Sequence, residues 1–458
     1  MMADARPTPP VLSGAKPLVG HLLEFRADRQ ALFQRGFAEL GKVFTIKLGP
    51  QPVAVLIGPD NHELFFMQTD EELNISTPYK FLEAAFGQVL FIAPREVYLR
   101  QRPLVLQAFR RQKMQRYAEV MQEQAQRWLD SLGESGEIEL TAAINNLVQQ
   151  IAGYALMGEE FQRQAGEEFW QLYVDIGLSL DPVLPPRLPL PKFIRRDRAK
   201  KRMKEILEPI IAARRLHPER YDDFLQDFVC QSYDDGTPVE DAVLLSLMLG
   251  LMFAGHETTA GQAAWTIIQL LQHPDYHRLV QEEIDDLLPP GTPIDDKVMR
   301  RLQHLSWAVR ETERTRPSAD MLYRDVDEPV EAGGYTIPAG WRVQVATEVA
   351  HMLPELWENP EQYDPLRYAP GREEHKQHRF SLIGFGGGTH KCMGMNFANN
   401  EMMIITALLF QQFEVELLTA EPAIRRGMGA NRPAETWVRY RQRDLAGTSQ
   451  PRRLVAEA

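Results

Sequence analysis

Phe385-Gly-Gly-Gly-Thr-His-Lys-Cys-Met-Gly394 leads directly into an apolar, helix-prone run from Asn396 to Leu409. Cys392 in this stretch is expected at a helix N-terminus, where the helix dipole and the free backbone N–H groups favour a thiolate. The neighbouring residues His390 and Lys391 add donors or positive charge, which lower the pKa of a thiol. The glycines let the backbone pass close to a flat group, because they carry no side chain that would clash with it.

A single cysteine is most often an inert core residue, but the sequence around Cys392 favours a different role. An anionic sulfur among hydrogen-bond donors suits a haem iron, whose O–O bond cleavage it assists by donating electron density. The pattern Phe-x-x-Gly-x-His-x-Cys-x-Gly resembles the haem-binding signature of the cytochrome P450 family. The resemblance implies that Cys392 is the axial ligand of the iron in haem b (iron protoporphyrin IX), and that Phe385 and Gly386 belong to the cofactor loop. It also implies the cytochrome P450 fold, which is mainly α with a small β component and a long central helix over the haem.

The resemblance covers nearly the whole chain of 458 residues, so we expect a single domain over residues 1–458 with an extended, proline-rich lead-in over residues 1–20. A net charge of −12 argues against nucleic acid as a partner. The only cysteines, Cys230 and Cys392, provide no disulfide framework and indicate a reducing compartment, so a cytoplasmic enzyme is expected. The segment Met1–Phe25 contains no long apolar run, so we expect neither a signal peptide nor a membrane anchor.

Hydrophobic periodicity predicts a mostly helical chain. Two β-branched runs in Val43–Ile57, separated by Gly49-Pro50, are typical of a hairpin, and a second β-rich stretch covers Val330–Val345. A proline cluster between residues 182 and 191 interrupts the helices and indicates either a lid or a linker. The expected helices lie at 96–111, 113–133, 140–158, 164–178, 193–215, 222–233, 239–272, 274–287, 301–315 and 394–412.

The segment Ala242–Gly255 is apolar on nearly every face, and Ser246 is its only polar side chain. A membrane span needs about 20 such residues, whereas His256 and Glu257 follow at once. A buried central helix is therefore the better interpretation.

Glu257 and Thr258 lie side by side in this apolar helix. A carboxylate and a hydroxyl are unfavourable there unless they are solvated or used, although a packing defect with a satisfied hydroxyl is the alternative. Threonine and glycine are poor helix formers, so the helix is expected to open locally and admit water. The family resemblance implies that both residues are catalytic. Thr258 would hydrogen-bond the bound dioxygen and Glu257 would help to relay protons to it.

The motif Glu311-Thr-Glu-Arg314 places a carboxylate and a guanidinium one helical turn apart, which by itself is most often a surface ion pair. The family has the same pair closed by a second arginine, which here is Arg367. The resemblance implies a structural cluster that holds the cysteine loop in place.

The haem propionates need cations or hydrogen-bond donors. The candidates are His390, Arg324 and Arg102, the last of which matches the arginine of a family Trp-x-x-x-Arg pattern that begins here with Tyr98. Arg100 is close enough in sequence to be the real contact, and each of these cations could instead be solvated.

Within the family the chain looks most similar to sterol 14α-demethylases, through segments such as Phe253-Ala-Gly-His256 and Gly333-Gly-Tyr-Thr-Ile-Pro338. It departs from them at Glu257, where they usually have histidine, and at Ala84–Leu90, which lacks the proline and the second glycine of their loop over the haem pocket. Both departures fall where substrate and oxygen chemistry are set. We therefore expect a monooxygenase that inserts one atom of O2 into a lipophilic molecule such as a sterol, steroid, terpenoid or fatty acid, with sterol 14α-demethylation proper as the alternative.

Two further functions remain open. Hydroperoxide isomerases share the fold but typically lack the oxygen-activating threonine, and a haem-binding sensor would need neither Glu257 nor Thr258. Candidate substrate contacts, which could equally be plain core, are Phe86, Phe91, Met252, Met321 and Leu322, with Asp320 as a polar handle.

Electrons must come from a separate protein, because the chain has no flavin domain and no cysteine cluster for an iron–sulfur centre. Arg110, Arg111, Lys113 and Arg116 form a basic stripe on an otherwise acidic protein. This stripe is either a solvated helix face or a docking surface for an acidic ferredoxin or flavodoxin that its own reductase supplies with electrons.

Overall fold

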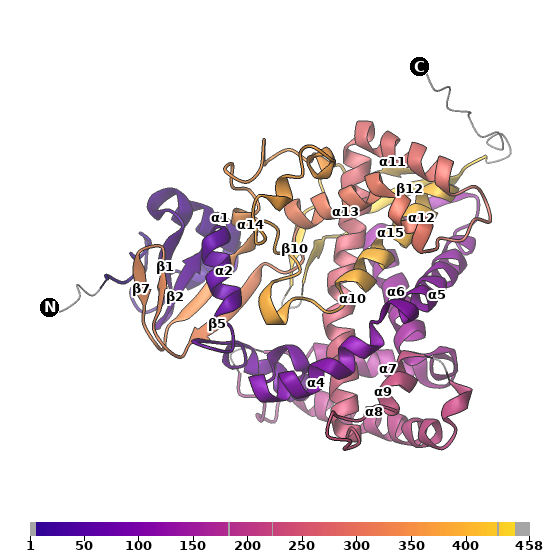
Figure 1. Cartoon of the computed structure of the whole chain (residues 1–458), viewed down its shortest axis with the longest axis horizontal. Coiled ribbons are helices and arrows are strands. Elements are labelled where there is room, and N and C mark those ends of the chain that lie inside the picture. Colours follow the sequence, from indigo (N-terminus) through magenta and orange to yellow (C-terminus); the bar gives the residue numbers. More distant parts are fainter. Residues whose placement is uncertain (1–5, 182–183, 222, 428–429, 445–458) are drawn as a thin grey trace.

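The computed structural model describes residues 6–181, 184–221, 223–427 and 430–444. Figure 1 shows a mostly helical part on one side of the molecule and a strand-containing part on the other, where β1, β2, β5 and β7 lie beside α1, α2 and α14. The predicted fold class, mainly α with a small β component, is therefore confirmed.

The helices of the described residues are, in chain order, α1 Leu22–Leu40, α2 Pro59–Met67, α3 Glu83–Phe86, α4 Arg95–Ala108, α5 Arg111–Asp130, α6 Leu140–Ala152, α7 Glu159–Gly177, α8 Pro191–Leu216, α9 Phe224–Val229, α10 Asp241–Gln272, α11 Pro274–Leu287, α12 Asp296–Arg301, α13 Gln303–Thr315, α14 Thr347–Ala350 and α15 Met395–Gln412. A π-helical turn, Gly153–Met157, extends α6. Short 3₁₀ turns lie at Thr77–Leu82, Leu90–Ile92, Pro218–Arg220, Pro365–Tyr368, Glu374–Lys376 and Gly388–His390.

The strands form a five-stranded sheet in the order β1-β2-β8-β5-β3, a three-stranded sheet β4-β12-β9 and the pairs β6-β7 and β10-β11. Side chains alternate between the two faces of a strand, and in β2 Val53 and Val55 join one buried apolar cluster while Ala54 and Leu56 join another. The large sheet is therefore covered on both faces. The strands are β1 Val43–Leu48, β2 Gln51–Leu56, β3 Leu73–Asn74, β4 Ser135–Glu139, β5 Met321–Val326, β6 Val330–Ala332, β7 Tyr335–Ile337, β8 Arg342–Ala346, β9 Phe413–Leu417, β10 Ile424–Arg426, β11 Asn431–Pro433 and β12 Trp437–Gln442.

Helix α10 is the centre of the helical part, because it packs against α6, α13, α15 and β11. Within the described residues it is also the one helix long and apolar enough to cross a membrane by length and composition, a test that the core helix of a soluble protein passes as well. From Thr259 to Leu270 every side chain is buried. The predicted segment Ala242–Gly255 is part of this central helix, but it is buried only in part, since Ala242, Ala254 and Gly255 are exposed.

The predicted helices and the hairpin at Val43–Ile57 are present. The sequence patterns missed the helices α1, α2, α3, α12 and α14, the strands β3 and β4, and the strands after α15. Helix α1 buries few residues (Leu32, Phe33 and Gly36) and bends at Asp28, so it carries little periodic signal. Helix α2 is only nine residues long and starts on Pro59. Residue 222, where one helix was expected to start, and residues 182–183 of the proline cluster lie outside the described residues.

Candidate active site

The loop before α15 is held by its own backbone and by α2. The N–H of Cys392 donates to the carbonyl oxygen of Phe385 at 2.9 Å, which closes the loop. Gly386 and Gly388 have φ angles of +70° and +63°, the left-handed region that favours glycine. A Cβ atom on Gly388 would lie 2.5 Å from the carbonyl oxygen of Phe66 in α2. Here the glycines are required by a turn and by close packing against protein.

The thiol of Cys392 lies just before the first residue of α15, as predicted, and its side chain is accessible. Interactions with the N–H groups of Gly394 and Met395 lower the pKa of this thiol, and the charge of Lys391 acts in the same direction. Desolvation by the surrounding protein has the largest effect and raises the pKa of the thiol, although the Cys392 side chain is exposed at one side. The helix N-terminus therefore supplies the expected donors, but the chain alone does not hold the sulfur as a thiolate.

The predicted cluster of Glu311, Arg314 and Arg367 is confirmed, and all three side chains are fully buried. Arg314 bonds Glu311 at 2.7 Å from the next turn of α13, and Arg367 reaches the same carboxylate at 3.0 Å. Arg367 also bonds Glu374 at 2.7 Å. Buried charges of this kind persist only when they are paired and hydrogen-bonded on all sides.

His351 connects this cluster to the cysteine loop. The Arg314 guanidinium donates to the carbonyl oxygen of His351 at 2.9 Å, and the His351 ring Nδ1 lies 3.1 Å from the carbonyl oxygen of Arg314. The N–H of Ile383, just before the glycines, donates to Nε2 at 3.0 Å. Burial lowers the pKa of His351 to about 3, so the ring is neutral, with Nδ1 as donor and Nε2 as acceptor. The buried ion cluster thus fixes the position of the loop through one histidine.

The Thr258 hydroxyl donates to the carbonyl oxygen of Ala254 at 2.6 Å, one turn earlier in α10. The carbonyl oxygen of Thr258 accepts a hydrogen bond from Ser318 at 3.0 Å. Helix α10 runs unbroken from Asp241 to Gln272, so the expected local opening of the helix is absent. The Thr258 hydroxyl hydrogen-bonds a carbonyl group of its own helix, and the helix continues without a break.

Glu257 has a partner that sequence reasoning missed, because Arg432 of β11 lies 3.7 Å from its carboxylate. Strand β11 can approach α10 this closely because Gly261 has no side chain. A Cβ at Gly261 would lie only 2.8 Å from the carbonyl oxygen of Asn431. Glu257 and Arg432 are both partly exposed, with 37% and 27% of their side-chain surfaces accessible. The acid therefore faces an accessible space and a cation at once.

Two predicted cations contact the turn that follows α2, and a third is linked to them through Tyr98. Arg324 is buried and donates from Nε to Thr69 at 2.9 Å, while His390 Nε2 lies 2.6 Å from the carboxylate of Asp70. Tyr98 interacts with Arg102 through its hydroxyl and packs its ring 4.0 Å from that of His390. Sequence patterns gave no signal for Asp70, because it is 320 residues from His390.

Arg100 points elsewhere. Its guanidinium lies 4.0 Å from the ring centroid of Tyr233 and 3.5 Å from the carboxylate of Asp235. Of the two arginines considered from the sequence, the geometry favours Arg102 as the one that faces the cysteine loop.

Known proteins match this chain along most of its length. The cytochrome P450 family matches residues 9–435. The chain belongs to the cytochrome P450 family. A sterol 14α-demethylase of Mycolicibacterium vanbaalenii is 32% identical over 446 residues, which cover 95% of this chain and 98% of the relative. A sterol 14-demethylase of Arabidopsis thaliana is 31% identical and covers 96% of this chain and 92% of its own. The solved structure of cyanobacterial CYP120A1 with retinoic acid has a TM-score of 0.84 at 24% identity, covering 96% of this chain and all of the other, and shares the fold.

As a cytochrome P450, the chain is a haem-dependent monooxygenase that uses O2 and a lipophilic substrate. Its residues fit the cofactor. The Nε of Arg102 and the Nδ1 of His390 are buried and have no hydrogen-bond partner among the described residues. An unpaired buried N–H donor such as that of Arg102 is rare unless a ligand satisfies it, and a haem propionate needs such a donor.

The candidate substrate residues divide between two clusters. Phe86 and Met252 are buried in the helical core, and Phe91 packs against that core. Leu322 packs instead with the cluster on one face of the large sheet, and Met321 is the first residue of β5. Asp320 bonds Arg29 at 2.6 Å and Arg426 at 3.0 Å. Both of its oxygens are engaged, so the expected polar handle is wrong.

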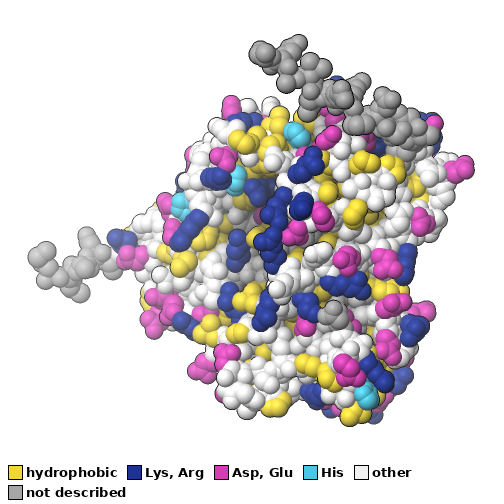
Figure 2. Space-filling model, turned by 45° about the vertical axis from the view of Figure 1, so that its right-hand side comes forward, with side chains coloured by type: hydrophobic (Ala, Val, Ile, Leu, Met, Phe, Trp, Pro, Cys, Tyr) yellow, Lys and Arg dark blue, Asp and Glu magenta, His cyan; other side chains and the backbone are white. Residues whose placement is uncertain are grey.

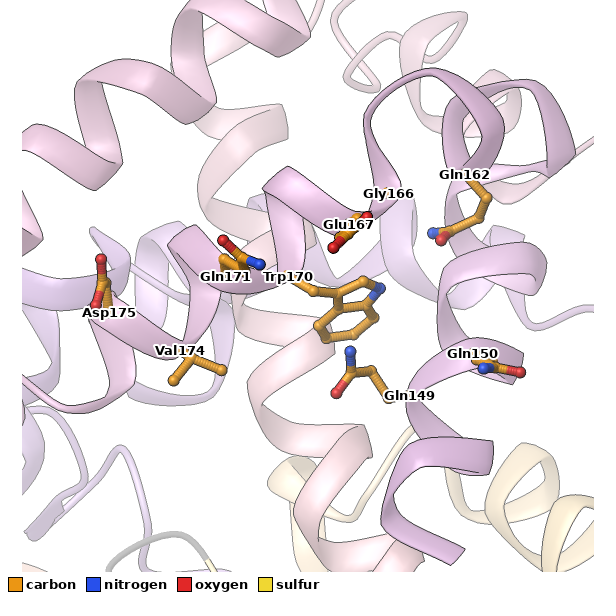
Figure 3. Close-up of a pocket in the computed structure, with 9 residues that line it drawn as sticks. All are labelled: Gln149, Gln150, Gln162, Gly166, Glu167, Trp170, Gln171, Val174 and Asp175. Carbon is orange, nitrogen blue, oxygen red and sulfur yellow. The ribbon is translucent and has the colours of Figure 1, made fainter. Parts of the chain in front are cut away.

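A separate groove of about 590 Å³ lies between α6 and α7 and contains none of the predicted site residues. Figure 3 shows its polar lining, with Gln149 of α6 facing Trp170 of α7. Trp170 packs against α10, because its ring centroid is 5.8 Å from that of His256. We place the chemistry at the Cys392 loop and not at this open surface.

Proposed function

We propose that this cytochrome P450 oxidises a rigid polycyclic lipid such as a sterol, steroid or cyclic terpenoid. The observation that carries the proposal is an aromatic wall against α10, formed by Phe86, Phe91 and Phe253. The ring centroid of Phe253 lies 4.5 Å from that of Phe86 and 6.3 Å from that of Phe91. Phe91 and Phe253 are only partly buried, and the buried Phe86 packs against Phe253. The two accessible rings offer a stiff apolar surface, which suits a stiff apolar partner because few torsions are lost on binding.

The named sterol demethylases support the substrate class, but Glu257 supports a reaction other than 14α-demethylation. We propose Cys392 as the axial iron ligand, with Phe385 and Gly386 in the loop around it, and Arg102, Arg324 and His390 as contacts of the propionates. The thiolate-ligated haem supplies the activation of O2.

The distal residues then have separate tasks. The Thr258 hydroxyl donates to the Ala254 carbonyl and could turn this hydrogen bond toward the dioxygen site. Glu257, partly exposed, takes protons from water and passes them toward Thr258. Arg432, 3.7 Å away, helps to hold the Glu257 carboxylate in place beside Thr258.

We propose that a ferredoxin or flavodoxin delivers the electrons, but the basic stripe supports this only in part. Arg111 pairs with Asp296, Lys113 with Asp227 and Arg116 with Glu119, which neutralises much of the stripe. Two observations support docking near the iron ligand. Phe109, next to Arg110, packs 5.9 Å from Phe397 of α15, and Lys391 is exposed beside Cys392.

Figure 2 shows Lys and Arg side chains gathered near the centre of one face of this acidic protein, so local positive charge is available. A cytoplasmic location, a single domain over residues 1–458 and the absence of a membrane anchor stay predictions.

The substrate is tested by titrating the haem-loaded protein with sterols, steroids, cyclic terpenoids and fatty acids, and recording the spectral shift of the haem. We expect the polycyclic compounds to give the shift at the lowest concentrations. Phe86→Ala should weaken their binding by about tenfold, roughly 1.4 kcal/mol, whereas Phe25→Ala, in a different aromatic pair, should not. A shift with fatty acids alone, or unchanged affinity in Phe86→Ala, would contradict the proposal.

A further inference from the structure

Glu313 is the second variable residue of the Glu311-x-x-Arg314 motif and faces the cysteine loop from α13. A Cβ on Gly384 would lie 2.5 Å from the Cγ atom of Glu313 and 2.7 Å from its Oε1. Gly384 is therefore the position that makes room for this acid. The backbone N–H groups of Gly384 and Phe385 interact with the carboxylate.

This contact reaches Cys392 in two steps along the backbone. Glu313 interacts with the N–H of Phe385, and the carbonyl oxygen of Phe385 accepts the N–H of Cys392 at 2.9 Å. When ionised, the Glu313 carboxylate also places a negative charge only these two backbone contacts away from Cys392.

The groups around Glu313 do not explain it as a structural ion pair. Arg310 on the same helix and Lys391 on the loop act on it electrostatically, but no salt bridge of Glu313 is found among the described residues. The Arg310 side chain lies 3.1 Å from His375, and the charge of Glu313 also acts on the buried Tyr368. Burial raises the pKa of Glu313 to about 7. A half-buried carboxyl without a salt-bridge partner among the described residues is unfavourable for stability, so an apolar residue would serve folding better.

We propose that Glu313 is a positioning residue for Cys392: it fixes Phe385 and places a negative charge behind the sulfur, which strengthens electron donation from the thiolate. This inference rests on the proposed role of Cys392 as the iron ligand. Negative charge near the sulfur favours the ferric over the ferrous form, so Glu313 would make the bound iron harder to reduce.

The test uses haem-loaded protein at pH 8.5, where the carboxyl is ionised, and measures the midpoint potential by equilibration with redox dyes. One electron passes from the dye to the ferric iron. Glu313→Gln keeps an acceptor for the two N–H groups but removes the charge. We expect the reduction equilibrium to move about tenfold toward the ferrous form, which is about 59 mV for one electron. Glu373→Gln, an exposed acid paired with Lys376, is the matched control and should leave the potential unchanged.

A second measurement, the rate of haem loss, tests whether Glu313 positions the cysteine loop. Glu313→Leu removes both charge and acceptor, so we expect faster haem loss to a haem scavenger than in Glu313→Gln. A wild-type potential in Glu313→Gln would overturn the electrostatic role, and wild-type haem retention in Glu313→Leu would overturn the role in positioning. Failure of the ligand assignment is distinguishable, because it appears in Cys392→Ser and not in any Glu313 variant.

Discussion

At the scale of single residues, opposing effects act on the pKa of the Cys392 thiol. Backbone N–H groups and Lys391 favour the thiolate, while surrounding protein and the charge of Glu313 oppose it. Binding of a ferric iron shifts this balance, because a metal stabilises the deprotonated thiol directly. The chain thus prepares the donors and leaves ionisation to the cofactor.

The first prediction concerns this ligand. Cys392→Ser should lose the red-shifted carbon monoxide spectrum that a thiolate ligand gives to reduced haem, because an alcohol donates far less electron density. Cys230→Ser is the control, since that cysteine lies at the end of α9 beside Gln226. Loss of the spectrum in the Cys230 variant, together with its retention in the Cys392 variant, would show that the assignment is wrong.

The second prediction separates oxygen chemistry from substrate binding. Thr258→Ala should bind substrate and accept the first electron normally, but release hydrogen peroxide in place of product, because protons no longer reach the right oxygen atom. Product formed per electron consumed is the measurement. Thr266→Ala is a matched control, because Thr266 makes the same type of bond to Gln262, one turn earlier in α10. Equal coupling in the two variants would rule out a proton-relay role for Thr258.

Between elements, the decisive contact is that of the cysteine loop with α2. The loop rests on Phe66, and Phe66 stacks on Phe380 with ring centroids 5.5 Å apart. Helix α2 in turn leads into the turn of Thr69 and Asp70, which binds Arg324 and His390. One short helix therefore supports both the ligand loop and the cations expected to hold the propionates.

The third prediction tests this packing. Gly388→Ala should lower the free energy of unfolding by about 1–3 kcal/mol through backbone strain, with a further loss because the added Cβ would lie 2.5 Å from the Phe66 oxygen. Gly236→Ala has a similar positive φ of +82° with nothing within 4 Å, so it measures strain alone. Equal losses of stability in denaturant titrations of the two variants would argue against close packing on α2.

A fourth prediction concerns pH and the junction of α13, α14 and the loop at His351. The folded pKa of this ring is about 3, against about 6.5 in the unfolded chain, so the unfolded state binds more protons between these values. His351 makes its full contribution to the free energy of unfolding above pH 6.5. This contribution falls by about 1.4 kcal/mol per pH unit as the pH drops toward 3. His62, with a folded pKa of about 4, acts in the same direction.

The measurement is the free energy of unfolding at pH 7 and pH 5. His351→Gln should be less stable at both values, because it disturbs the bonds to Arg314 and Ile383. It should also show a smaller difference between the two pH values, by about 2 kcal/mol. An unchanged difference would mean that His351 does not titrate on unfolding.

At the scale of the whole molecule, an acidic protein must attract an acidic electron carrier through local positive charge. Charge reversal in Lys391→Glu or Arg110→Glu should slow reduction by a ferredoxin, mainly through the encounter rate. The deficit should shrink as salt rises, because screening acts over about 8 Å at physiological ionic strength. Arg439→Glu, on the far-removed strand β12, is the control. Wild-type reduction rates at low salt in the first two variants would show that the basic residues form a solvated face and not a docking surface.

The sequence by itself determined the family, the cofactor and the central helix. The Cys392 motif is local, and the apolar run Ala242–Gly255 is long, so both are readable without knowledge of their neighbours. The Glu311 cluster was predicted only through resemblance, since Arg367 is 56 residues away in the sequence.

Only the tertiary structure decided the partners of the polar residues. Arg432 beside Glu257, Asp70 beside His390 and Glu313 behind Phe385 each join segments far apart in the chain. Hydrophobic periodicity reports which face of an element is buried, and it carries no information about which distant side chain meets that face. A charged residue on a helix therefore looks the same in the sequence whether it contacts water or, as Glu313 does, the loop that carries Cys392.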